Sequence, residues 1–135
     1  MRRIVLAALA LTVFAACGDA FSPEDVSGYY QLVSLNGNSI PYSETTTASG
    51  VTVETTYSAG SSTLNENRTW NSSLSIEFRM DTLTWDQNST DSGTFTLVEP
   101  ATVQFTNESG QQVAATLDGD RLTLNAAGWS FVYER

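Results

Sequence analysis

Hydrophobic and polar residues alternate along most of the chain from Gly28 onward, which is the pattern of β-strands that bury one face. The clearest run covers Arg68–Met80. Its apolar side chains all fall on even positions, at Trp70, Leu74, Ile76, Phe78 and Met80, whereas the odd positions from Asn71 to Arg79 are polar. No segment of about ten residues repeats its apolar side chains near every 3.6 positions, as an amphipathic helix would. The chain is therefore expected to be all-β.

The same alternation recurs in shorter runs towards the C-terminus. The apolar members are Leu83 and Trp85, Phe95 and Leu97, Val103 and Phe105, Val113, Ala115 and Leu117, Leu122 and Leu124, and Trp129, Phe131 and Tyr133. Turn-forming residues separate these runs, at Asn88–Gly93, Glu99-Pro100, Asn107–Gly110, Asp118–Asp120 and Ala127-Gly128. Asp118-Gly119 between two alternating runs is a strong hairpin signal, because glycine adopts a positive φ without steric cost.

The first third of the domain has a weaker pattern. Gly28–Leu35 is expected to be a strand, and Asn36-Gly37 after it is a second hairpin signal. Ser39–Thr47 and Val51–Tyr57 are rich in threonine and could pair with each other around a turn at residues 48–50. Their apolar content is low, so residues 39–60 could instead be partly irregular, and the strand layout of this region is left open.

About eight to ten short strands joined mostly by hairpin turns favour a small antiparallel up-and-down β-barrel, with a β-sandwich as the alternative. Closing such a meander removes the exposed sheet edges. The polar face of Arg68–Met80 argues against a transmembrane barrel, because such a strand would need an apolar face towards lipid.

The N-terminus has the organisation of an export signal. Arg2 and Arg3 precede an uninterrupted, mostly apolar run, Ile4–Ala16, which is too short to span a bilayer as a helix. Phe14-Ala15-Ala16-Cys17 resembles the lipobox of bacterial lipoproteins, with Phe14 where leucine is usual. The resemblance implies cleavage before Cys17 and acylation of that cysteine; an ordinary secreted protein with a chance cysteine is the alternative.

Three regions follow from this organisation: a lipoprotein signal peptide at residues 1–16, a lipidated N-terminus and short tether at 17–27, and a barrel domain at 28–135. The protein is expected to be exported and held on a bacterial membrane through the lipid on Cys17, facing the periplasm or the cell surface. More than one acyl chain is needed for stable anchoring of this kind.

Composition excludes several classes of function. Without residues 1–16, the chain has four arginines, no lysine and 15 acidic residues, a formal net charge of −11. This charge argues against binding to nucleic acid or to anionic lipid. The lack of histidine and lysine excludes Ser-His-Asp and Cys-His catalysis, His/Cys metal clusters and Schiff-base chemistry. With one cysteine the chain forms no internal disulfide. We therefore expect no enzyme activity, no metal and no cofactor.

Two weaker chemical signals depend on carboxylates. A pair of acids could act as in glycoside hydrolysis, but the candidates are spread over faces expected to be outward: Glu54, Glu77, Asp81, Asp86 and Asp91. Asp86–Asp91 loosely resembles a calcium-binding loop but lacks the glycine and the terminal glutamate of the EF-hand. Solvated surface acids and an ordinary polar turn are the preferred interpretations.

The order of these segments resembles the short lipocalin-like lipoproteins of bacteria, over residues 28–135. The resemblance is carried by Gly28–Gly37, Ser62–Trp70, Asp91–Leu97, Leu117–Leu124 and Trp129–Tyr133. Tyr30 stands where lipocalins have the tryptophan of a Gly-x-Trp motif, and no segment of residues 28–135 has the pattern of the family's terminal helix. The resemblance implies a barrel that binds a small apolar molecule without catalysing a reaction.

The residues expected to face inwards either fill the barrel or line a ligand pocket. They are Tyr30, Leu32, Trp70, Leu74, Ile76, Phe78, Trp85, Phe95, Leu97, Phe105, Leu117, Leu124, Trp129, Phe131 and Tyr133. A filled core is the preferred interpretation, because large aromatic rings fill a small barrel quickly. Two functions remain open: a tethered barrel that binds a small hydrophobic ligand or an envelope protein, and a structural or interaction lipoprotein that acts through its polar surface and loops.

Overall fold

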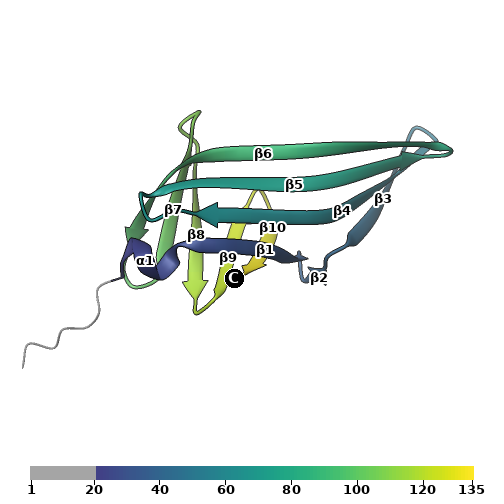
Figure 1. The fold of residues 1–135 in the computed structure, drawn as a ribbon. Coiled ribbons are helices and arrows are strands. Elements are labelled where there is room, and N and C mark those ends of the chain that lie inside the picture. The colour runs from purple at the N-terminus through teal and green to yellow at the C-terminus, as the bar shows by residue number, and fades with distance from the viewer. Residues whose placement is uncertain (1–20) are drawn as a thin grey trace, which may run out of the picture.

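A computed structural model describes residues 21–135 as a nearly all-β domain (Figure 1). One helical turn precedes ten strands. The elements are α1 (Pro23–Val26), β1 (Gly28–Leu35), β2 (Asn38–Ser39), β3 (Tyr42–Ala48), β4 (Val51–Leu64), β5 (Thr69–Met80), β6 (Leu83–Val98), β7 (Thr102–Asn107), β8 (Gln112–Asp118), β9 (Arg121–Ala126) and β10 (Trp129–Glu134). The expected signal peptide and Cys17 lie outside the described residues.

Eight of the strands form a closed antiparallel barrel. From β4 to β10 each strand pairs with the next one in the sequence. β1 closes the barrel by pairing with β10 through Gln31–Leu35 and with β4 through Gly28–Gln31. The short strands β2 and β3 are additions to this barrel. The expected up-and-down barrel is therefore confirmed, and the sandwich alternative is wrong.

Three barrel strands continue well beyond the barrel. β4, β5 and β6 have 14, 12 and 16 residues, and their far ends project past the other strands together with β3 (Figure 1). We call this projecting four-stranded sheet, residues 42–57 and 75–88, the blade. β6 pairs with β7 only from Gly93 onward, so within the described residues its part of the blade is a free sheet edge.

The predicted hairpin turns connect their strands through two residues each. Asn36-Gly37 and Ala127-Gly128 all have positive φ values, 50° and 80° in the first turn and 51° and 81° in the second. This is the backbone geometry that two-residue hairpins prefer. The hairpin predicted at Asp118-Gly119 is also present, because Asp118 pairs with Arg121 across it. All three turn predictions are confirmed.

The region left open by the sequence is regular. β3 pairs with β4 from Tyr42–Tyr57 to Ala48–Val51, so residues 39–60 are mostly strand. A register shift between Tyr57 and Ala59 then changes which residues of β4 face inwards. Odd-numbered residues share the face of Ile76 before the shift, and even-numbered residues share the face of Leu74 after it.

The turn predicted at Asn88–Gly93 is wrong, because these residues continue β6 and pair with β5 from Trp70 to Ser75. Polar residues suit this stretch because most of it is exposed and its neighbour strand already supplies the backbone hydrogen bonds. Gly93 is needed for close packing rather than for a turn. A Cβ atom at this position would lie 2.0 Å from the backbone oxygen of Thr106 on β7.

The core fills the end of the barrel next to α1. Its buried members are Val26, Tyr30, Leu32, Leu64, Phe95, Val103, Phe105, Ala115, Leu117, Leu122 and Tyr133. Val26 is fully buried and Phe21 packs against this cluster, so the segment expected to be a tether is part of the folded domain from Phe21 on. The Tyr30 hydroxyl donates to the Val26 carbonyl at 2.7 Å.

Arg135 covers this end of the barrel. Its guanidinium lies 5.4 Å from the centre of the Tyr30 ring. Its nitrogens donate to the backbone carbonyls of Asp25 and Ser27 at 3.0 and 2.9 Å and form an ion pair with Asp120 at 2.9 Å. One side chain thus connects α1, the C-terminus and the β8–β9 turn.

Candidate binding site

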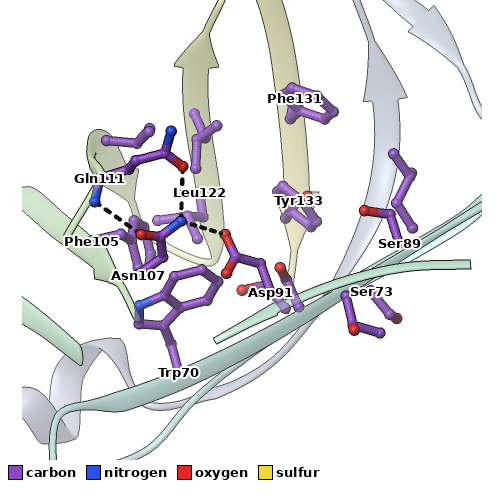
Figure 2. Close-up of a pocket in the computed structure, with 16 residues that line it drawn as sticks. Trp70, Ser73, Ser89, Asp91, Phe105, Asn107, Gln111, Leu122, Phe131 and Tyr133 are labelled. Atoms are coloured by element: carbon purple, nitrogen blue, oxygen red, sulfur yellow. Dashed lines mark hydrogen bonds between the residues drawn. The ribbon is translucent and has the colours of Figure 1, made fainter. Parts of the chain in front are cut away.

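A cavity of about 260 Å³ lies inside the barrel, on the side where the blade leaves it, and it is partly open (Figure 2). β4, β5 and β6 form one wall, and β7 to β10 form the other. The lining residues are Ser62, Trp70, Ser72, Ser73, Leu74, Ser89, Thr90, Asp91, Phe105, Asn107, Gln111, Val113, Leu122, Leu124, Phe131 and Tyr133. The barrel is therefore not completely filled by its side chains.

Trp70 and Phe105 form the aromatic wall of the cavity. Their ring centres are 5.3 Å apart in an edge-to-face arrangement, which is favourable for aromatic pairs. The Trp70 ring is held in place because Nε1 donates to the Thr94 carbonyl at 3.0 Å. Phe95 lies 6.3 Å behind Phe105 and supports it from the core. The wall is therefore pre-formed rather than assembled by a ligand.

Several hydroxyl groups line the cavity without a partner. The hydroxyls of Ser62, Ser72, Ser89, Thr90 and Tyr133 have no hydrogen-bond partner among residues 21–135. Ser62 and Ser72 are opposite each other on β4 and β5. Burial raises the pKa of the Tyr133 hydroxyl to about 12, so it is a neutral donor at physiological pH. The hydroxyls can donate to, or accept from, one polar group of a bound molecule.

A hydrogen-bond cluster around Asn107 borders the cavity. The Asn107 amide nitrogen donates to the Asp91 carboxylate at 3.3 Å and to the Gln111 side chain at 3.0 Å (Figure 2). Its side-chain oxygen accepts from the backbone N–H groups of Ser109 and Gln111 at 3.1 and 2.9 Å. Asn107 thus connects the β7–β8 turn to β6 at the position where β6 and β7 stop pairing. Asp91 is the one carboxylate among the lining residues just given.

The structure distributes the residues expected to face inwards over three environments. Those that line the cavity are Trp70, Leu74, Phe105, Leu124, Phe131 and Tyr133. Tyr30, Leu32, Phe95 and Leu117 are buried in the core beside it, and Leu97 packs against that core. Ile76 and Phe78 are half-buried on the blade, and Trp129 lies at its base with its ring centre 5.5 Å from that of Tyr57.

Trp85 is the exception, and the expectation that it faces the interior is wrong. It is 45% exposed and stacks on Phe78 at 5.4 Å between ring centres. Both residues lie on the face that is inward in the barrel, but β5 and β6 have left the barrel at this point. The alternation of apolar and polar residues correctly placed Phe78 and Trp85 on the same face. It could not show that this face is uncovered beyond the barrel.

Sequence reasoning missed the polar residues of the cavity. Ser72 carried a signal, because it occupies an even position among the apolar residues of β5. In the sequence, Asp91 is a candidate acid expected to face outward, Asn107 belongs to an expected turn, and Gln111 carries no signal. Their proximity depends on how the β7–β8 hairpin lies against β6, which is a tertiary feature.

The structure changes the interpretation of the carboxylates that were considered as a catalytic pair or as a calcium-binding loop. Asp86–Asp91 is strand rather than loop, so the calcium-loop interpretation is wrong. Of the five candidate acids only Asp91 lines the cavity, and the others lie on or at the tip of the blade. Among residues 21–135, no three histidine, cysteine, aspartate or glutamate side chains form a group that could hold a metal ion.

Comparison with models of known protein families, with curated proteins and with solved structures found no match to this chain. Within residues 21–135, there is no helix with the length and apolar character needed to cross a membrane.

Proposed function

We propose that this protein is an exported lipoprotein, anchored through Cys17, whose barrel binds a small amphiphilic molecule without catalysing a reaction. The observation that carries the binding function is the cavity of about 260 Å³ with apolar walls and several hydroxyl groups that have no partner among residues 21–135. The anchor is supported by the N-terminal sequence, Arg2-Arg3 followed by an apolar run that ends at Cys17.

The cavity defines the class of ligand. Its volume is at the lower end of ligand pockets, which measure about 300–1,000 Å³. A one- or two-ring molecule or a short acyl chain fits this size, and the aromatic wall of Trp70 and Phe105 suits a flat apolar body. The hydroxyls of Ser62, Ser72 and Tyr133 suit one neutral polar group. Asp91 disfavours a ligand with negative charge.

Ligand binding is tested with 1-naphthol, which has a flat apolar body and one hydroxyl. We expect native mass spectrometry and quenching of tryptophan fluorescence to show one bound molecule per chain. Ser72→Leu should fill the cavity and weaken binding at least tenfold, whereas Asn71→Leu, on the opposite face of the same strand, should leave it unchanged. Equal binding by both variants would exclude the cavity as the site.

The anchor is tested separately by cell fractionation. The full-length chain expressed in a bacterial host should be found in the membrane fraction, with an N-terminal peptide whose mass includes acyl chains on Cys17. Cys17→Ser should abolish that modification. A wild-type chain exported without acyl groups would make it an ordinary secreted protein and would leave the binding proposal standing.

A structural or interaction lipoprotein acting through its surface is the second candidate. The version with a filled core is not favoured, because the cavity is open. A specific surface does favour an interaction role, and it is independent of the cavity.

A further inference from the structure

The blade has one apolar face that no other element in residues 21–135 covers completely. Cross-strand partners show which side chains share this face: Phe78 pairs with Trp85, Met80 with Leu83, Ala48 with Val51 and Thr46 with Val53. The opposite face is polar, with Ser43–Thr56 and Thr47–Thr52 hydroxyl pairs at 2.7 and 2.9 Å. The blade is therefore an amphipathic sheet.

The apolar face is exposed where it lies farthest from the barrel. Leu83 is 60% exposed, Val51 47% and Trp85 45%, and these are three of the five large hydrophobic residues that are exposed in the described chain. Phe78, Met80 and Val53 lie among them and are only half-buried. Clusters of this kind, rather than scattered apolar residues, indicate an interaction surface.

A sheet with one apolar face normally buries it against a second layer. In β-sandwiches that layer is another sheet about 10 Å away, with alternating side chains of both sheets interdigitating. We propose that the second layer is the blade of another copy of this chain, packed face to face about a two-fold axis. The two blades then form a sandwich of eight strands between two barrels.

The size of the face allows a weak dimer of this kind. Four strands about 4.8 Å apart, each six or seven residues long at about 3.4 Å per residue, give a face of about 420 Å² per copy. Two copies bury roughly 850 Å², somewhat below the lower limit of about 1,000 Å² for a stable specific interface. The dimer is therefore weak and reversible. The two-fold arrangement satisfies the requirement that the same surface be used by both copies.

The charges of the blade permit this packing and oppose a membrane as the occupant. The blade has five acidic residues and one arginine. Glu54, Glu77 and Asp86 lie on its polar face, where Glu54 is beside Arg79, so they stay outside a face-to-face dimer. Glu44, on the apolar face, accepts a hydrogen bond from the Tyr57 hydroxyl at 3.2 Å. An anionic lipid surface would repel the same acids.

The test uses site-specific photo-cross-linking, which traps weak complexes. Two versions of the full-length chain with different tags are co-expressed in a bacterial host, each with p-benzoylphenylalanine in place of Leu83. The matched control carries the same probe in place of Thr84, which lies on the polar face of the same strand. We expect irradiation to yield a product of twice the chain mass that contains both tags, from position 83 and not from position 84.

Charge substitutions beside the probe provide a second readout. With the probe at Leu83, Trp85→Glu should lower the yield of the cross-linked dimer at least tenfold, whereas Thr84→Glu should leave it unchanged. Both residues are exposed and outside the barrel core, and circular dichroism checks that both variants stay folded. Equal yields from positions 83 and 84, no dimer, or a product with a protein of another mass would each overturn the proposal. Neither readout depends on Cys17 or on the cavity.

Discussion

At the scale of single residues, the fold depends on a few positions where one atom decides whether two strands can approach. Gly93 is the clearest case. It lies opposite Trp70 on β5 and opposite Asn107 on β7, at the point where β6 joins the barrel. The missing side chain leaves room for the β7 backbone, and the Trp70 indole donates to the neighbouring Thr94 carbonyl. Gly93 is therefore needed both for the aromatic wall of the cavity and for the pairing of β6 with β7 in the barrel.

Gly93→Ala should destabilise the protein by about 1–3 kcal/mol, because the added methyl group would overlap the Thr106 carbonyl and push β7 away from β6. Urea unfolding followed by tryptophan fluorescence measures this change. Thr94→Val, at the adjacent exposed position, keeps a β-branched side chain and should change stability by less than about 0.5 kcal/mol. Equal effects of the two substitutions would show that β6 and β7 have room to adjust.

Tyr133 should make the stability depend on alkaline pH. Its pKa is about 12 in the folded protein and about 10 when unfolded, because burial disfavours the phenolate. Between these values the unfolded chain loses the proton and the folded chain keeps it, so stability falls as pH rises from 10 to 12, by about 2–3 kcal/mol. Below pH 10 the contribution is complete.

Urea unfolding at intervals from pH 9 to 12 measures this loss. Burial also raises the pKa of Tyr30 and Tyr57, so the comparison with Tyr133→Phe isolates the contribution of Tyr133. We expect the phenylalanine variant to lose about 2–3 kcal/mol less than the wild type over this range. Parallel curves for the two proteins would contradict the assignment of the shift to this residue.

At the scale of elements, the short helix α1 stays on the barrel through a small number of contacts. Val26, the last residue of α1, is buried, and Arg135 reaches from the C-terminus to the Asp25 and Ser27 carbonyls at the end of the helix. A four-residue helix is not stable by itself, because helix nucleation is costly. Tertiary contacts therefore hold α1, and the expectation of a polar tether from the sequence could not include them.

Arg135→Met should loosen this end of the domain. The substitution removes two hydrogen bonds to backbone carbonyls and the ion pair with Asp120, and we expect a loss of about 1–2 kcal/mol. Hydrogen exchange should become faster in residues 22–28. Arg121→Met is the control, because Arg121 only pairs with the exposed Glu134, which is worth at most about 1 kcal/mol. Faster exchange in both variants would mean that Arg135 has no special role.

At the scale of the whole molecule, the barrel and the blade should differ in stability although they share three strands. The barrel part of β6 has partners on both sides, whereas its blade part has β5 alone. The large buried side chains are concentrated in the barrel. Local opening needs the least free energy where few contacts are buried, so the blade should open while the barrel remains closed.

Hydrogen exchange measured by mass spectrometry can detect this difference. At low protein concentration, peptides from residues 83–91 should exchange at least tenfold faster than peptides from residues 94–98 of the same strand. The face-to-face dimer would slow exchange in the blade as the concentration rises, because it stabilises the sheet. Uniform protection along β6 at every concentration would contradict both the independent opening and the dimer.

The sequence by itself determined the strand class, most of the hairpins and the face on which each large side chain lies. These features are local: a strand exposes alternate side chains on opposite faces, and Asn-Gly or Ala-Gly pairs adopt the positive φ values of tight turns. This is why Trp70, Phe105, Phe131 and Tyr133 could be selected before the cavity was known. The assignment of Asn88–Gly93 to a turn failed because residue type alone does not show whether a neighbouring strand is present.

Only the tertiary structure decided what covers each face. Trp70 and Trp85 lie on the inward face of two neighbouring strands, yet one lines a cavity and the other is on an open sheet. The difference arises because β7 accompanies β6 only as far as Gly93, a long-range pairing that no local pattern encodes. The cavity, its hydroxyl groups and the apolar blade all follow from where the partner strands end.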